Sequence, residues 1–188
     1  EGHGNVDLMG AIKKSCDCYF YNLAKEIKID RLASFSNKFS YGSITGIDIP
    51  NELKGIMPDS EWKIQNRGGK WQKGETLNTV IGQGFTLSTP LQMTLMTARL
   101  ATGKNIIPSI IFRKKEFESL NISEKNLEFI KESMFSVVND TQGTAFRSRL
   151  NGLKQMAGKT GTSQVRKISL KERESEKGVI KNEELLYK

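Results

Sequence analysis

The sequence predicts one globular domain of mixed α and β structure. Apolar residues recur at helical spacing in several segments, whereas Ile106 to Phe112 and Gln155 to Val165 lack that period and are predicted as strands. A chain of 188 residues is long enough for a core, since a domain of this size buries roughly 70% of its unfolded surface. Hydrophobic residues make up 37% and charged residues 27%, which is typical of a globular protein.

The first part of the chain is predicted to form three helices. Asp7 can cap a short helix that ends near Lys14. A second helix is expected from Tyr19 to Ile27, because four apolar residues fall on one face: Phe20, Leu23, Ala24 and Ile27. Asp30 can cap a third helix, whose inward face carries Leu32, Phe35 and Phe39 and which Gly42 ends.

The middle of the chain alternates between irregular and helical segments. Ser43 to Gly84 is rich in glycine and shows no sustained period, so we expect loops with short strands that line a cleft. Thr89-Pro90-Leu91-Gln92 combines an N-cap, a proline at the first helical position and a returning glutamine, which predicts a helix that Gly103 ends. Ser123 is expected to open another helix, with Leu127, Ile130, Met134 and Val137 on one face.

Charge and cysteine content exclude several classes of function. Lys and Arg number 29 against 21 Asp and Glu, a net charge of +8, but the basic residues are scattered, so no nucleic-acid partner is expected. Cys16 and Cys18 stand too close in sequence for an unstrained disulfide and have no further ligands nearby, so we expect free thiols, no metal and no cofactor. No apolar run approaches the ~20 residues that span a bilayer.

Lys159-Thr160-Gly161-Thr162 is the most informative short motif. Gly158-Lys159-Thr160 matches the end of a phosphate-binding loop, but the first glycine of that loop would have to stand at position 153, which is Leu153. As a strand, the motif would place Lys159 and Gly161 on one face and Thr160 and Thr162 on the other. A peptide could then pair with the strand edge while the lysine and the hydroxyls bind its carboxylate. An ordinary Gly/Thr-rich edge strand remains the alternative.

Ser15-Cys16-Asp17 places a hydroxyl and a carboxylate in a tight connection between two predicted helices. Asp17 is equally plausible as the N-cap of the second helix. The single histidine, His3, lies close to the terminus, so a lysine is the better candidate to activate or assist a serine, as in Ser-Lys variants of the catalytic triad.

Together, Ser15-Cys16-Asp17 and the distant Lys159-Thr160-Gly161-Thr162 resemble the second and third motifs of penicillin-recognising acyltransferases, S-D-N and K-T-G. Longer stretches resemble the class B penicillin-binding proteins of the penicillin-binding protein 2 type. The resemblance extends over nearly the whole chain. The stretches that carry it are His3-Gly4, Ser15 to Tyr21, Pro58 to Lys63, Thr76 to Gly84 and Lys159 to Val165.

The resemblance implies the mixed fold of penicillin-binding transpeptidases and serine β-lactamases, incomplete at both ends. It implies a peptidoglycan D,D-transpeptidase that attacks D-Ala-D-Ala stem peptides and is acylated by β-lactams. Ser15 would relay protons with the help of Lys159, and Asp17 would hold a catalytic lysine charged or oriented. Thr160 and Thr162 would bind the substrate carboxylate, and Gly161 would leave room for the peptide. The expected setting is the periplasmic face of the bacterial inner membrane, beside a glycan polymerase of the elongation machinery.

The chain also departs from the family pattern. The S-x-x-K motif with the nucleophilic serine is expected upstream of Glu1, so the chain alone is predicted to be inactive. Ser60-Glu61-Trp62-Lys63 has this spacing but follows Ser15, and Ser60 is therefore interpreted as a coincidental match. Residues 1–165 are assigned to the transpeptidase domain and 166–188 to a charged loop leading to the next strand. Two alternatives stay open, a non-catalytic β-lactam or peptide sensor and a serine β-lactamase of the same fold.

Overall fold

The computed structural model describes residues 2–112, 116–152 and 154–163. The elements in this part of the chain are helical: α1 (Leu8–Lys13), α2 (Asp17–Ala24), α3 (Ile29–Asn37), α4 (Ser60–Arg67), α5 (Lys73–Val80), α6 (Pro90–Thr102), α7 (Glu124–Asn139) and the 3-10 turn η1 (Phe146–Ser148). Two isolated antiparallel bridges, Ile56 with Leu87 and Lys104 with Ser119, join loops. No described helix combines the length and the apolar character needed to cross a bilayer.

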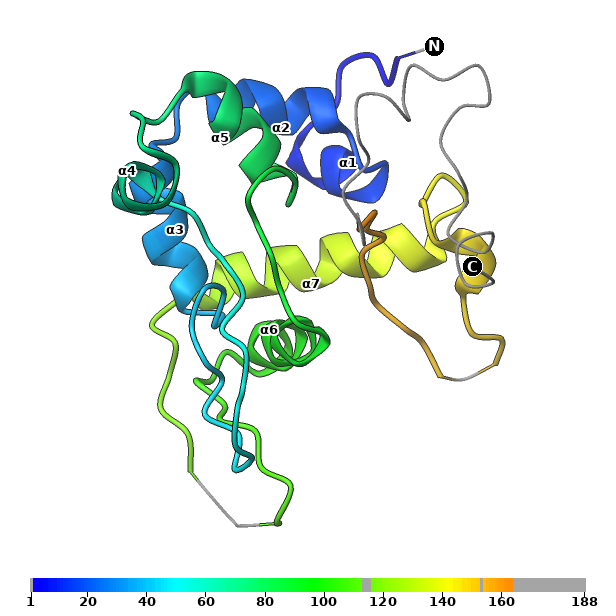
Figure 1. Ribbon diagram of the computed structural model, residues 1–188. Helices are drawn as coiled ribbons and strands as arrows, with labels where there is room; N and C mark the ends of the chain where they lie inside the picture. Colours follow the sequence, from blue (N-terminus) through cyan, green and yellow to red (C-terminus); the bar gives the residue numbers. More distant parts are fainter. Residues whose placement is uncertain (1, 113–115, 153, 164–188) are drawn as a thin grey trace, which may run out of the picture.

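The long helix α7 forms the centre of the arrangement (Figure 1). It packs against α1 on one side and α6 on another, while α2 packs against α1 and α5. The buried core lies where these helices meet and contains Ala11, Leu95, Val137 and Val138. Because α1 and α7 are held by this core, the loops at their ends are placed on a rigid support.

Helix α6 begins and ends as its sequence predicts. The Thr89 hydroxyl accepts a hydrogen bond from the Gln92 N–H, and Gln92 Oε1 accepts one from the Thr89 N–H. Gly103 ends the helix in the left-handed conformation. The Gln92 side chain is fully buried and also donates to the carbonyl groups of Ser40, Ser43 and Lys54. Gln92 therefore both caps α6 and fixes the irregular segment between α3 and α4.

Helices α4 and α5 correct the prediction of loops and short strands for Ser43 to Gly84. Helix α4 has a clear start, since the Asp59 side chain accepts a hydrogen bond from the Trp62 backbone. Neither helix shows a clear apolar period in its sequence, because α4 buries no residue fully and α5 buries only Thr76 and Thr79. Periodicity could not reveal helices that bury so little apolar surface.

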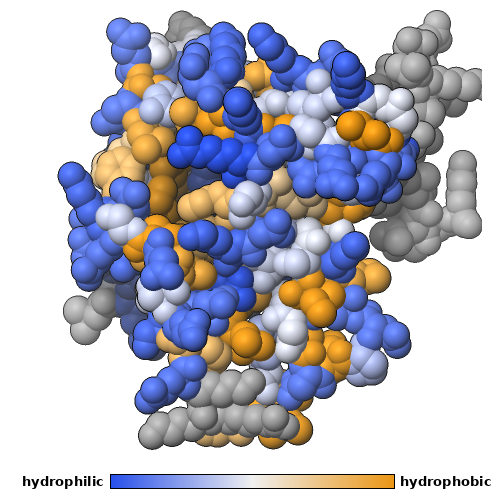
Figure 2. All heavy atoms as spheres, turned by 90° about the vertical axis from the view of Figure 1, so that its left-hand side faces the viewer, coloured by the Kyte–Doolittle hydropathy of each residue, from blue (hydrophilic) through white to orange (hydrophobic). Residues whose placement is uncertain are grey.

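The predicted strand from Ile106 to Phe112 is wrong in this structure. The segment makes no strand pairing, and Ile110, Ile111 and Phe112 are exposed. Its irregular backbone is held instead by the carboxylate of Asp48, which accepts hydrogen bonds from Ser109 Oγ and the Ile110 N–H. Figure 2 shows apolar side chains in the lower half of the molecule, where this loop and the loop after α3 extend away from the core.

The predicted cap of the third helix is shifted. Helix α3 begins one residue before Asp30, and the Asp30 carboxylate instead accepts hydrogen bonds from the backbone and hydroxyl of Ser60. As predicted, Asp7 caps α1 and Ser123 stands at the N-cap position of α7. The helix predicted from Tyr19 to Ile27 instead runs over Asp17–Ala24, and α3 ends at Asn37, before Phe39 and the predicted stop at Gly42.

Candidate active site

A cleft of about 630 Å³ lies between the start of α2, the end of α5 and the segment 159–162. All six predicted site residues line it: Ser15, Asp17, Lys159, Thr160, Gly161 and Thr162. The remaining lining residues are Phe20, Val80, Ile81 and Gln83. The structure therefore brings together two motifs that are more than 140 residues apart in sequence.

Ser15 is placed by the way α1 ends. The Ser15 N–H bonds the carbonyl of Ile12 over 3.3 Å, and the Cys16 N–H bonds the carbonyl of Ala11 over 2.9 Å, which together form a Schellman motif. The residue in the left-handed position of this motif is usually glycine, yet here it is Ser15 with φ +50°. Ser15 is therefore held in a backbone conformation that costs free energy for a residue with a Cβ.

Lys159 and Ser15 are in direct contact. Lys159 Nζ donates to Ser15 Oγ over 2.5 Å and to the carbonyl of Thr160 over 2.9 Å. Desolvation lowers the pKa of Lys159, although the residue as a whole is exposed, and the negative charge of Asp17 opposes that shift. The ammonium group therefore sits beside a hydroxyl in surroundings that ease the release of its proton.

The segment 154–163 is extended but forms no strand within the described residues, which corrects the predicted strand for its Gln155 to Ser163 part. Single hydrogen bonds hold it instead. The Gly158 N–H bonds the carbonyl of Met134, and the Asn139 side chain donates to the carbonyl of Met156. Without a neighbouring strand in the described part of the chain, this backbone has no ladder to complete. Residues 164 and 165 lie outside the described residues.

The prediction that Lys159 and Thr160 point to opposite faces of the segment is also wrong. Lys159 Nζ and Thr160 Oγ1 both reach Ser15 Oγ, the latter at 3.1 Å, because the long lysine side chain turns back over the next peptide group. Gly161 has no atom within 4 Å of the position that a Cβ would take. Packing against the described residues therefore does not require glycine there, and the backbone at Gly161 stays open toward the cleft.

Asp17 occupies the first turn of α2, one residue after the N-cap position held by Cys16. The N-cap alternative for Asp17 is therefore wrong. Asp17 lines the cleft. The Coulombic attraction of its carboxylate partly offsets the lowering of the Lys159 pKa by desolvation. A negative charge in the first helical turn is favourable for the α2 dipole, so the fold tolerates it without a separate partner.

Two further residues complete the site and were missed by sequence reasoning. Thr144 Oγ1 lies 2.8 Å from Thr160 Oγ1, and Gln83 Nε2 donates to the carbonyl of Thr162 over 2.9 Å. Each follows a glycine in a short connection after a helix, Gly143 and Gly82 respectively. That position is the one sequence signal that could have indicated them, since loops at helix ends commonly carry functional side chains.

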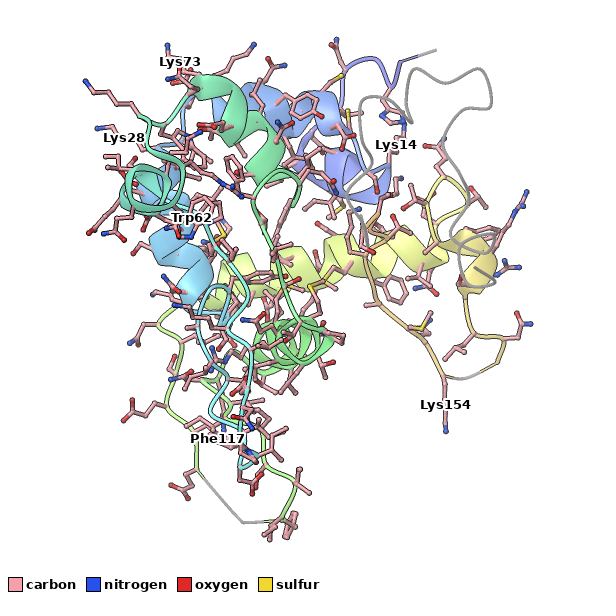
Figure 3. All side chains as sticks on the ribbon, in the orientation of Figure 1. Lys14, Lys28, Trp62, Lys73, Phe117 and Lys154 are labelled. Atoms are coloured by element: carbon pink, nitrogen blue, oxygen red, sulfur yellow. The ribbon has the colours of Figure 1, made fainter. Side chains whose placement is uncertain are left out.

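Other candidates lie away from the cleft. Ser60 is the first residue of α4, and its hydroxyl donates to Asp30, in agreement with its interpretation as a coincidental match. Lys28 and Lys73 project from one side of the molecule and Lys154 from the opposite end, so these basic side chains form no single patch (Figure 3). Both cysteines are free thiols. In the described ranges, no three His, Cys, Asp or Glu side chains are grouped to hold a metal ion.

Three known proteins show how this chain is related to others. Peptidoglycan D,D-transpeptidase MrdA of Acinetobacter baumannii is 37% identical over 93% of this chain and 28% of its own length. The Helicobacter pylori penicillin-binding protein PBP2, solved in complex with MreC, is 40% identical with a TM-score of 0.82, covering 87% of this chain and 31% of that one. Pseudomonas aeruginosa PBP2 in complex with WCK 5153 is 35% identical with a TM-score of 0.77, covering 85% and 39%.

These matches confirm the predicted fold class, that of penicillin-binding transpeptidases, although the strands expected in this chain are not formed in the described residues. The chain spans about a third or less of the first relatives it matches. Residues 1–180 match the penicillin binding protein transpeptidase domain. The chain therefore belongs to the family of penicillin-binding protein transpeptidase domains, of the PBP2 type.

Proposed function

We propose that this chain forms the substrate-docking and proton-relay side of a peptidoglycan D,D-transpeptidase. The observation that carries the proposal is the 2.5 Å contact between Lys159 Nζ and Ser15 Oγ inside the cleft. A charged donor next to a hydroxyl, with more hydroxyls and an open glycine along the same wall, suits an anionic peptide terminus and the transfer of a proton.

The reaction takes place in two steps. A serine hydroxyl attacks the carbonyl carbon of the penultimate D-Ala, the peptide C–N bond breaks, and the terminal D-Ala leaves as an amine after taking a proton. An amine of a second stem peptide then attacks the acyl ester, forms the new amide bond and releases the serine. The acylated serine belongs to an S-x-x-K motif in the longer protein, since Ser15 serves as the relay and Ser60 lies outside the cleft.

Each of the six predicted site residues has one role in this reaction. Ser15 passes the proton to the departing amine, and Lys159 stabilises the charge that develops on Ser15 Oγ. Thr160 and Thr162 donate hydrogen bonds to the terminal carboxylate, and Gly161 leaves space for the peptide backbone. Asp17 keeps Lys159 protonated against the effect of desolvation.

The relatives support a proposal about the cellular location and the partners of the longer protein. One of them was solved with MreC, which supports a place in an assembly. We therefore extend the proposal to a protein held at the periplasmic face of the inner membrane, working beside a membrane glycan polymerase. Co-purification of the full-length protein with a polymerase from detergent-solubilised membranes would support this setting, and its recovery as a free protein would count against it.

The test is to incubate the full-length protein that contains this chain with fluorescent penicillin and with stem peptides ending in D-Ala-D-Ala. A long-lived covalent adduct together with cross-linked peptide product supports the proposal. Rapid turnover of penicillin would indicate the β-lactamase alternative, and reversible binding without an adduct would indicate the sensor alternative. Adduct formation at Ser60 would overturn the assignment of the cleft.

A further inference from the structure

The hydroxyl groups of Ser15, Thr144 and Thr160 lie close to one another. Thr144 Oγ1 and Thr160 Oγ1 are 2.8 Å apart, Ser15 Oγ and Thr160 Oγ1 are 3.1 Å apart, and Ser15 Oγ and Thr144 Oγ1 are 3.4 Å apart. Each hydroxyl can donate only one hydrogen bond but can accept two. The direction of each donation therefore decides which protons remain available to a ligand.

Thr144 is firmly placed although it lies in a turn. Its N–H donates to the carbonyl of Lys13, and Lys13 forms an ion pair of 2.8 Å with Asp140 at the start of the same turn. Gly143 would place a Cβ only 2.2 Å from the carbonyl oxygen of Val137, so the backbone there is closely packed. The turn thus fixes the Thr144 hydroxyl relative to the end of α1.

Thr144 does not line the cleft, whereas Thr160 and Ser15 do. It contacts Ser15 and Thr160 from outside the set of residues that line the cleft, although its own side chain is exposed. Its nearest hydroxyl partner is Thr160, since the distance to Ser15 is longer by several tenths of an ångström. If Thr144 donates to Thr160 Oγ1, this donation occupies one lone pair of Thr160. The Thr160 proton is then available to Ser15 Oγ, at 3.1 Å, or to a ligand.

We propose that Thr144 is a positioning residue that orients the Thr160 hydroxyl, so that Thr160 donates to a substrate carboxylate. If the Thr160 proton pointed back to Thr144 instead, Thr160 would turn lone pairs toward an anion and repel it. This inference rests on the proposed role of Thr160 in carboxylate binding. It adds that the preference for a free carboxylate depends on a hydroxyl outside the set of residues that line the cleft.

The test compares acylation of the full-length protein by benzylpenicillin and by its methyl ester, which lacks the anionic carboxylate. Thr144→Val removes the hydroxyl with little change in shape, and Thr144→Ser restores it. Hydrogen bonds to a charged group correspond to about a tenfold effect or more. We expect Thr144→Val to lower the acylation rate with benzylpenicillin about tenfold and to leave the rate with the ester unchanged, whereas Thr144→Ser keeps the wild-type ratio of the two rates.

The control is Thr97→Val on α6, whose hydroxyl bonds the carbonyl of Met93 in its own helix and should leave both rates unchanged. An equal loss with both ligands in Thr144→Val would show a structural role and overturn the inference. A lost preference in Thr160→Val but an intact one in Thr144→Val would overturn the inference alone. An intact preference in both variants would overturn the proposed role of Thr160 as well.

Discussion

Ser15 offers a prediction in which stability and activity separate. The residue combines a hydroxyl contact to Lys159 with a left-handed backbone at φ +50°. Ser15→Gly and Ser15→Ala both remove the hydroxyl, but only glycine relieves the backbone strain. The two variants should therefore be equally inactive and unequally stable.

The size of the difference can be worked out from the structure. A residue other than glycine in the left-handed conformation costs about 1–2 kcal/mol. The greater freedom of glycine in the unfolded chain offsets about 0.4–1 kcal/mol of that gain. Ser15→Gly should therefore be more stable than Ser15→Ala by about 1 kcal/mol. In a unit of 150–250 residues this corresponds to a difference of roughly 2–4 °C in Tm.

The assay measures thermal unfolding and penicillin acylation of both variants in the full-length protein. We expect acylation to fall to the same low level in both, because each has lost the relay hydroxyl. If Ser15→Ala were as stable as Ser15→Gly, the left-handed conformation would not be a source of strain. If Ser15→Gly retained full acylation, Ser15 would have no part in the reaction.

Three other changes test neighbouring parts of the site. Asp17→Asn removes the attraction that raises the pKa of Lys159, so protonated Lys159 should be lost at lower pH and the alkaline limb of the acylation profile should move to lower pH. Gly143→Ala forces a Cβ against the carbonyl of Val137 and should destabilise the fold by about 1–3 kcal/mol, measured by chemical denaturation. Gln83→Leu removes the hydrogen bond to the Thr162 carbonyl and should raise KM for stem peptides about 3–10-fold, measured by steady-state kinetics.

Each of these changes has a matched control. Glu61→Gln removes an exposed carboxylate on α4 and should leave the pH profile unchanged. Gly74→Ala adds a methyl group in α5 where nothing lies within 4 Å, and should leave stability unchanged or slightly higher. Gln65→Leu removes a side-chain amide that donates to Glu61 in the same helix and, among the described residues, does not line the cleft, so KM should stay unchanged. A control that behaved like its partner would contradict the corresponding explanation.

Local signals predicted local structure well. The capping residues Asp7 and Thr89 and the stop at Gly103 lie where the structure has them, because the interactions they make span only a few residues. Helices α4 and α5 were missed because polar helices that bury little apolar surface have no clear period. The apolar run from Ile106 was misread as a strand, since a short apolar run does not distinguish a strand from an exposed loop.

The site could be predicted only in part. Six of the ten residues that line the cleft were found from motifs. The contact of Ser15 with Lys159 joins positions 144 apart and depends on how α1 packs against α7. Thr144 shows why the rest was out of reach. Its role arises from its distance to Thr160, and a threonine after a glycine is common in loops without any such neighbour.

The most direct test of the central claim, that Ser15 and Lys159 act as one unit in acyl transfer, is a double-mutant cycle on the second-order rate constant of acylation by penicillin. Ser15→Ala and Lys159→Met should each lower this rate constant by about 100-fold or more. If the two side chains act together, the double variant should be no slower than the slower single variant. A double variant slowed by the product of the two single effects would contradict the account.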